Sequence, residues 1–233
     1  MMNPAQEAIA RAIWDIGAFK TVDHPTAVRR GDERGFLLKS HEKDPNLPLS
    51  PFYLNLRTSD NPKPGPLTSD IVQLIAKMMR TLVDQRGVDY NVVAGIPNAG
   101  DPFAEQFVAL SPAVPLIRLG KGMDTDKRKI LGVISGTVVM GQTAIVVDDL
   151  ITKADSKFEA IESLENTGLC VQDIVVLVDR EQGGAQELEK EGYSLHSVFR
   201  ISELLRFYHD EELISPAAFE QIAGYLFPGL KKT

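Results

Sequence analysis

Residues 144–156 read Ala-Ile-Val-Val-Asp-Asp-Leu-Ile-Thr-Lys-Ala-Asp-Ser, and this stretch is the most informative part of the chain. Residues 144–147 are apolar and predict a buried strand. Asp148 and Asp149 follow at the end of this strand, and a helix is expected to begin at Ser156. Carboxylates can accept hydrogen bonds from sugar hydroxyls, and the free N–H groups at a helix start can bind a phosphate. The stretch therefore favours a sugar-phosphate site over a Mg²⁺-binding Asp pair or a plain strand–helix junction.

The composition of the whole chain excludes several classes of protein. A length of 233 residues allows one α/β domain with a small addition, and a net charge of −7 without a long basic block disfavours nucleic-acid binding. The single cysteine, Cys170, lies between two apolar residues and is expected to be a core thiol in a reducing compartment. No apolar run reaches the ~18 residues of a membrane span, and the charged amphipathic start does not look like a signal peptide. A soluble cytoplasmic protein with no membrane partner is expected.

Apolar strand patterns alternate with helical patterns in the second part of the chain, which predicts an α/β fold with a central, mostly parallel sheet flanked by helices. Strands are expected at 91–96, 114–119, 143–148, 173–178 and 194–199. Helices are expected from Ser69 to a stop at Gly87, and at 101–110, 156–167, 185–191, 202–210 and 215–226, the last two covering the sheet. The first of these helices should bury Ile71, Leu74, Ile75, Met78 and Leu82.

The first 66 residues differ in texture from the rest. They combine a helix at 5–16 with two short extended stretches at 35–40 and 52–57, in a segment rich in proline and charge. Its aromatic and leucine side chains need burial, so we expect a small irregular subdomain over 1–66 and a core over 67–233. Within the core, residues 120–129 are expected to form a polar loop.

Three loops should meet at the edge of the sheet where its parallel strands end, since ligands of such sheets bind there. They cover residues 97–101, 149–155 and 179–184. A glycine-bearing turn over Pro97, Asn98, Ala99 and Gly100 can turn N–H groups toward an anion, although any strand–helix turn uses such residues. Arg180 offers a planar partner for a carboxylate or two carbonyls, with a surface pair to Glu181 as the alternative.

Three motifs carry a resemblance to a known family. The 144–152 stretch resembles the phosphoribosyl diphosphate (PRPP) signature of type I phosphoribosyltransferases. The string Asp179-Arg-Glu-Gln-Gly-Gly184 resembles the orotate phosphoribosyltransferase half of bifunctional UMP synthases. Phe36-Leu-Leu-Lys-Ser40, followed by Ser50-Pro-Phe-Tyr53, is similar to the N-terminal hood segment of that family. The resemblance extends over residues 10–205.

This resemblance implies an enzyme that converts orotate and PRPP to orotidine 5′-monophosphate and diphosphate, with Mg²⁺ carried by PRPP and no metal ligand from the protein. It also implies a homodimer. The ribose would contact Asp148 and Asp149, and orotate would contact Lys39, Thr152 and Arg180. The remaining assignments give the 5′-phosphate to Thr152, Lys153, Ala154, Asp155 and Ser156, and the diphosphate to Pro97, Asn98, Ala99 and Gly100.

The chain departs from the family pattern at two places. Lys153, Ala154 and Asp155 stand where the family commonly has small residues. Residues 120–129, expected to be mobile, lack the family's Lys/His register, so that Lys121, Lys127 or Arg128 would supply the catalytic cation. Two alternatives therefore stay open: a phosphoribosyltransferase for another base, and a PRPP-sensing regulator without catalysis. The acidic balance of the chain disfavours the regulator.

Overall fold

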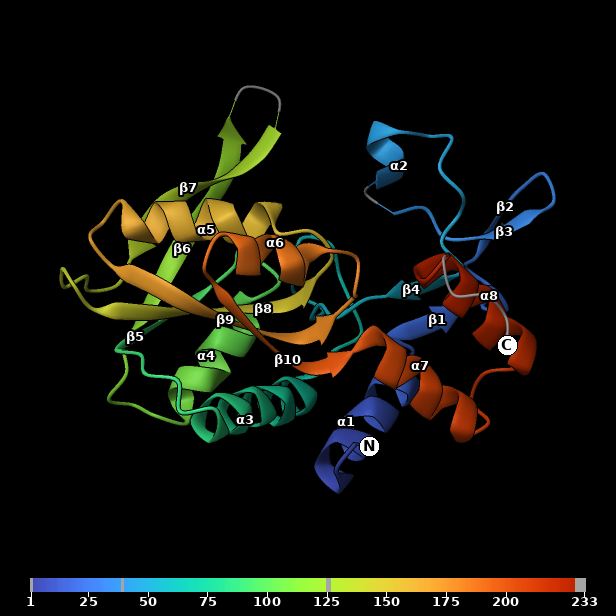
Figure 1. The fold of residues 1–233 in the computed structure, drawn as a ribbon, viewed down its shortest axis with the longest axis horizontal. Helices are drawn as coiled ribbons and strands as arrows, with labels where there is room; N and C mark the ends of the chain where they lie inside the picture. Colours follow the sequence, from blue (N-terminus) through green and yellow to red (C-terminus); the bar gives the residue numbers. More distant parts are fainter. Residues whose placement is uncertain (1, 39, 125–126, 229–233) are drawn as a thin grey trace. The chain divides into compact units, whose positions relative to one another are not determined.

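The computed structural model describes residues 2–38, 40–124 and 127–228, which form two compact units (Figure 1). One unit combines Met1–Asn55 with Ser202–Thr233, and the other is the continuous segment Leu56–Ile201. This division differs from the expected boundary after residue 66. It also places the C-terminal helices with the N-terminal residues, whereas the sequence pattern placed them on the sheet. In the part of the chain that is described, every helix is too short or too polar to span a membrane.

The continuous unit is built on a six-stranded sheet with the order β10-β9-β8-β5-β6-β7. Pairing is parallel throughout except between β6 and β7. The mostly parallel sheet expected from the sequence is confirmed. The strands are β5 (Val92–Gly95), β6 (Leu116–Asp124), β7 (Lys127–Ser135), β8 (Thr143–Ile151), β9 (Cys170–Asp179) and β10 (Ser194–Arg200).

Helices cover both faces of this sheet, with α3 (Ser69–Gln85) and α4 (Asp101–Ala109) on one face and α5 (Asp155–Glu165) and α6 (Gly184–Lys190) on the other (Figure 1). Residues 144–147 of β8 are therefore completely buried, as their apolar run predicts. The buried face of α3 differs from the expected one. It consists of Val72, Ile75, Ala76, Met79 and Val83, while Leu74 is 41% exposed. Two neighbouring apolar stripes share the helical period, and the stripe with the small Ala76 is the one that packs.

Two sequence-based expectations about this unit are wrong. The expected loop at 120–129 is wrong for its described part: residues 120–124 and 127–129 lie in the strands of the antiparallel β6–β7 hairpin, whose pairing contains two register shifts. Residues 125–126 lie outside the described residues. Cys170 is exposed and not a core thiol. Its neighbours Leu169 and Val171 are buried, and because side chains alternate along an extended chain, Cys170 faces the other way.

The discontinuous unit joins the two ends of the chain. It contains α1 (Pro4–Asp15), β1 (Phe19–Thr21), β2 (Val28–Arg30), β3 (Glu33–Gly35), α2 (Ser40–Lys43), β4 (Phe52–Leu54), α7 (Ile201–Asp210) and α8 (Pro216–Leu226). Strands pair antiparallel as β1–β4 and β2–β3. The buried hydroxyl of Tyr208 in α7 donates to the carbonyl of Ala10 in α1, at 3.0 Å, and its ring packs against those of Trp14 and Phe19.

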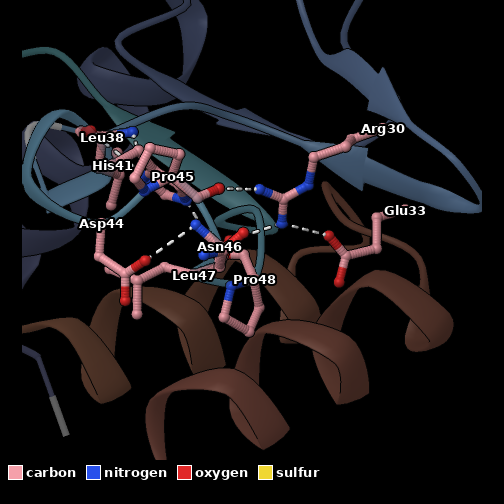
Figure 2. Close-up of polar contacts among 9 residues, drawn as sticks. All are labelled: Arg30, Glu33, Leu38, His41, Asp44, Pro45, Asn46, Leu47 and Pro48. Atoms are coloured by element: carbon pink, nitrogen blue, oxygen red, sulfur yellow. Dashed lines mark hydrogen bonds and ion pairs between the residues drawn. The ribbon is translucent and has the colours of Figure 1, made fainter.

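Residues 41–49 are additional to the two family-like strings of the hood segment, and polar contacts hold several of them (Figure 2). The guanidinium of Arg30 donates to the carbonyls of Pro45 and Leu47, both at 2.5 Å, and to the carboxylate of Glu33 at 2.8 Å. His41 stands where the family commonly has glycine. It is buried, and its ring accepts a hydrogen bond from the Leu38 N–H at 2.9 Å. These bonds satisfy backbone groups that no strand or helix pairs, and so give an irregular segment a defined shape.

Candidate active site

Two adjacent carboxylates lie in the last part of β8. The strand continues to Ile151, so Asp148 and Asp149 are inside it and not beyond its end as expected. Their exposed fractions are only 4% and 8%. The Asp149 N–H donates to Asp148 Oδ1 at 2.9 Å, and the Leu150 N–H donates to Asp149 Oδ1 at 2.7 Å. Each carboxylate is thus oriented by the backbone that follows it.

A lysine that was not among the expected site residues neutralises this pair. Lys157 lies in α5, and its side chain is 3% exposed. Its Nζ atom is 2.6 Å from Asp148 Oδ2 and donates to the Leu150 carbonyl at 2.6 Å. Lys157 shares the buried face of α5 with Ala160, Ile161 and Leu164. Its position in that apolar stripe is the signal in the sequence that could have identified it, because a lysine there needs a buried partner.

The charges at the site shift two carboxyl groups toward the neutral form. Burial and then the charge of Asp148 raise the pKa of Asp149 to about 7, while Lys157, the Leu150 N–H and Arg57 oppose the rise. Burial also raises the pKa of Asp101, at the start of α4, to about 6. Acidic groups this close resist simultaneous ionisation, so a ligand that donates hydrogen bonds or brings positive charge is favoured here.

The turn at residues 97–101 is packed tightly against β8. The Ile96 N–H donates to the Val147 carbonyl at 2.9 Å, and the Gly100 N–H donates to the Ile96 carbonyl at 2.8 Å. A Cβ atom on Gly100 would lie 2.3 Å from the Val147 oxygen, so only glycine fits. The Lys121 ammonium, from β6, donates to the Pro97 carbonyl at 3.0 Å. The structure therefore brings an expected catalytic cation to the expected diphosphate turn.

The other two loops are joined to each other. The Arg180 N–H donates to the Ile151 carbonyl at 2.9 Å, and the Gly184 N–H donates to the Thr152 carbonyl at 3.1 Å. Arg180 is 7% exposed, so its side chain is buried and not solvated. With the 97–101 turn bonded to Val147 and the 180–184 loop bonded to residues 151 and 152, all three loops adjoin β8.

Glu187 of α6 occupies part of the expected 5′-phosphate loop. Its carboxylate accepts from the Ala154 N–H at 2.9 Å and from the Lys153 ammonium at 3.1 Å. The hydrogen bonds from these two donors lower the pKa of Glu187, and desolvation, a smaller influence, opposes them. Of the loop's other members, Asp155 is exposed and Thr152 and Ser156 are half-buried. Nothing in the sequence indicates that a carboxylate from another helix binds this helix start.

Some expected residues fall outside this description. Lys39, assigned to orotate, lies outside the described residues. Lys127 and Arg128 lie in β7, where their backbones pair with Asp124 and Met123, but their side chains are not described. Among the described residues, no group of three His, Cys, Asp or Glu side chains could hold a metal ion.

Comparisons with known proteins show which family the chain belongs to. No model of a known protein family matches it. It is 30% identical over 187 residues to the orotate phosphoribosyltransferase of Sulfurisphaera tokodaii, a match that covers 78% of this chain and 88% of that protein. The chain belongs to the orotate phosphoribosyltransferase family.

Some longer relatives match this chain over part of their length only. The chain is 29% identical over 177 residues to the uridine 5′-monophosphate synthase of Bos taurus, covering 76% of this chain but 35% of that one. It thus spans about a third of the synthase. The UMP synthase of Leishmania donovani gives a structural match with a TM-score of 0.72 at 27% identity, covering 96% of this chain and 42% of that one. The orotate phosphoribosyltransferase of Aeropyrum pernix matches with a TM-score of 0.60 at 24% identity, covering 85% of this chain and 97% of that one, so the expected fold is confirmed.

Proposed function

We propose that this orotate phosphoribosyltransferase family member transfers the 5-phosphoribosyl group of PRPP to orotate, giving orotidine 5′-monophosphate and diphosphate in UMP synthesis. The observation that carries the proposal is the pair of buried carboxylates on β8, with the 97–101 turn on one side and the 152–156 loop on the other. A ribose with a phosphate group at each end needs acceptors at its centre and donors at both ends. This arrangement supplies both.

The proposed contacts follow from this geometry and from the family resemblance. Asp148 and Asp149 would accept hydrogen bonds from the ribose hydroxyls. The N–H groups of residues 152–156, with the positive end of the α5 dipole, would bind the 5′-phosphate. Residues 97–100 would bind the diphosphate, and Arg180 with Thr152 and Lys39 would bind orotate.

The chemistry at the anomeric carbon passes through a state with oxocarbenium character, so the protein must align two substrates and stabilise a departing diphosphate. Lys121, which contacts the Pro97 carbonyl, is the described cation best placed to do so. Mg²⁺ bound to PRPP would supply further neutralisation of the leaving group. No covalent nucleophile is required, and the exposed Cys170, at the start of β9, lies at the opposite end of its strand from Asp179 and Arg180.

A homodimer is part of the proposal. Leu131 and Ile134 of the edge strand β7 are 60% and 68% exposed. Apolar side chains of this size on an edge strand favour burial against another protein surface, and a second copy of the chain would provide it. The β6–β7 hairpin would then carry Lys127 and Arg128 toward the neighbouring subunit, as the resemblance implies.

Thermal unfolding with ligands tests the function. PRPP with Mg²⁺ should raise the melting temperature, because a ligand at 100 times its Kd stabilises by about 2.7 kcal/mol. Orotate, uracil, adenine and hypoxanthine are then compared in an assay of diphosphate release from PRPP, and only orotate should support release. Release with another base would show a different specificity. PRPP binding without release with any base would indicate a sensor, and no PRPP binding would refute the proposal.

A further inference from the structure

Lys157 is buried in the apolar face of α5, where a charged side chain is unfavourable unless it has a polar or charged partner. Its ammonium bonds Asp148 Oδ2 and the Leu150 carbonyl, both at 2.6 Å, while the other Asp148 oxygen accepts from the Asp149 N–H at 2.9 Å. We propose that Lys157 is a positioning residue, which fixes Asp148 and keeps the carboxylate pair of β8 charged for binding the ribose of PRPP. The inference rests on the proposed function of the pair.

Stability alone does not account for this lysine. Two charges taken from water lose hydration, and replacing a buried ion pair by apolar side chains of similar volume is often neutral or stabilising. The rest of the buried face of α5 is apolar, so a methionine at position 157 would continue it. Methionine, however, cannot donate hydrogen bonds to the Asp148 carboxylate and the Leu150 carbonyl. Each oxygen of Asp148 has its own donor, one from the helix and one from the strand, which leaves the carboxyl group a single orientation.

The charge of Lys157 also acts on the second carboxylate. The groups that face the pair are Asp101 of α4 and Arg57, with Lys121 and Arg118 of β6 acting on Asp101. Burial and Asp148 raise the pKa of Asp149, and Lys157 is the strongest of the influences that lower it. Without Lys157 the pKa of Asp149 would rise further above 7, so Asp149 would be protonated in a larger fraction of the molecules at neutral pH. A protonated carboxyl loses acceptor strength, because bonds to a charged acceptor are about twice as strong as neutral ones.

The test compares Lys157→Met with the parent and with Lys77→Met, a matched change at an exposed site of α3. The dissociation constant of PRPP is measured from pH 6 to pH 9. Lys157→Met should weaken binding at least tenfold at pH 7, and the loss should shrink as the pH rises and the pair ionises. Lys157→Arg, which keeps the charge, should recover most of the affinity. A loss of equal size at every pH, or no loss, would overturn the proposal.

A second variant separates positioning from folding. Asp148→Asn combined with Lys157→Met removes both charges, so it should regain the melting temperature that Lys157→Met loses, yet bind PRPP weakly at every pH. If the double variant regained affinity together with stability, Lys157 would act only on the fold and the proposal would fail.

A ligand-free measurement distinguishes this failure from failure of the proposed function. The titration of the aspartate carboxyl carbons, followed by ¹³C NMR, should shift to higher pH in Lys157→Met. If the shift occurs but the parent does not bind PRPP, the proposed function is wrong while the effect of Lys157 on the pair's charge stands. If the parent binds PRPP and no shift occurs, the inference is wrong.

Discussion

Gly100→Ala should damage both the stability of the protein and its PRPP site. Gly100 has φ −79° and ψ −25°, which alanine adopts without strain, so the backbone conformation does not require glycine. Glycine is required because the backbone at this position approaches β8 closely. A Cβ atom would lie 2.3 Å from the Val147 carbonyl oxygen and 2.7 Å from the Ile96 nitrogen. Ordinary C···O contacts are about 3.3–3.6 Å, so the first contact is about 1 Å too short.

The magnitude follows from two opposing effects. Overpacking a well-packed region costs about 1–3 kcal/mol, and a clash with the backbone of a central strand belongs at the upper end of that range. Alanine restricts the unfolded chain more than glycine does, which stabilises the folded protein by about 0.4–1 kcal/mol. The net loss is about 2 kcal/mol, which corresponds to a fall in Tm of roughly 4–8 °C for a chain of this length. The turn must shift to relieve the contact, so PRPP affinity should fall as well.

The matched control is Gly224→Ala. Gly224 lies in α8, and a Cβ atom there would meet no atom within 4 Å. Because alanine favours a helix more than glycine does, this variant should gain up to about 1 kcal/mol. Both variants are measured by calorimetry and by PRPP titration. A Gly100→Ala protein with the parent's Tm and PRPP affinity would refute the assignment of this turn as a tightly fitted diphosphate site.

Other predictions concern the charges of the site. The folded pKa of Asp149, about 7, exceeds the ordinary aspartate pKa of 3.8, so ionisation of Asp149 increasingly destabilises the folded protein as the pH rises between these values. Asp149→Asn should therefore raise Tm more at pH 8 than at pH 5, and an equal gain would contradict the shift. Arg180→Ala should weaken orotate binding by about 2–5 kcal/mol and leave PRPP binding nearly unchanged by calorimetric titration. Glu187→Gln should tighten PRPP binding, because it removes a negative charge from the phosphate loop, whereas Glu189→Gln on the same helix should not. Lys121→Ala should lower kcat more than PRPP affinity, since the diphosphate charge grows in the transition state, and wild-type kcat would exclude that role.

The sequence predicts the sheet and the position of the acidic pair because these depend on local patterns. The apolar run 144–147 predicts a buried strand, and these four residues are indeed buried in β8. The 97–101 turn and the 180–184 loop follow strands, so the topology of a parallel sheet is enough to bring them to β8. A rule about strand ends therefore predicts most of the candidate site.

The features that the sequence did not predict depend on contacts between distant residues. The β6–β7 hairpin carries glycines and charges because β7 is the edge strand and β6 beyond Arg118 pairs with β7 alone, so burial imposes only a weak apolar pattern there. Glu187 looks like an ordinary charged helix residue, while the apolar stripe around Lys157 indicates only that this lysine needs a buried partner. Their partners are Asp148, nine residues before Lys157, and the Ala154 N–H, which is 33 residues before Glu187. No local pattern identifies these partners.

The make-up of the discontinuous unit has a consequence for the order in which the protein folds. Leu56–Ile201 is complete as soon as residue 201 has left the ribosome, and its strands come from one uninterrupted segment. The first 55 residues cannot finish folding at that stage, because Trp14 and Phe19 pack against Tyr208. Closing this contact spans about 190 residues of chain, which is a slow step by the standards of local contacts. During synthesis, Trp14 and Phe19 can contact each other, but their packing against Tyr208 must await the synthesis of α7.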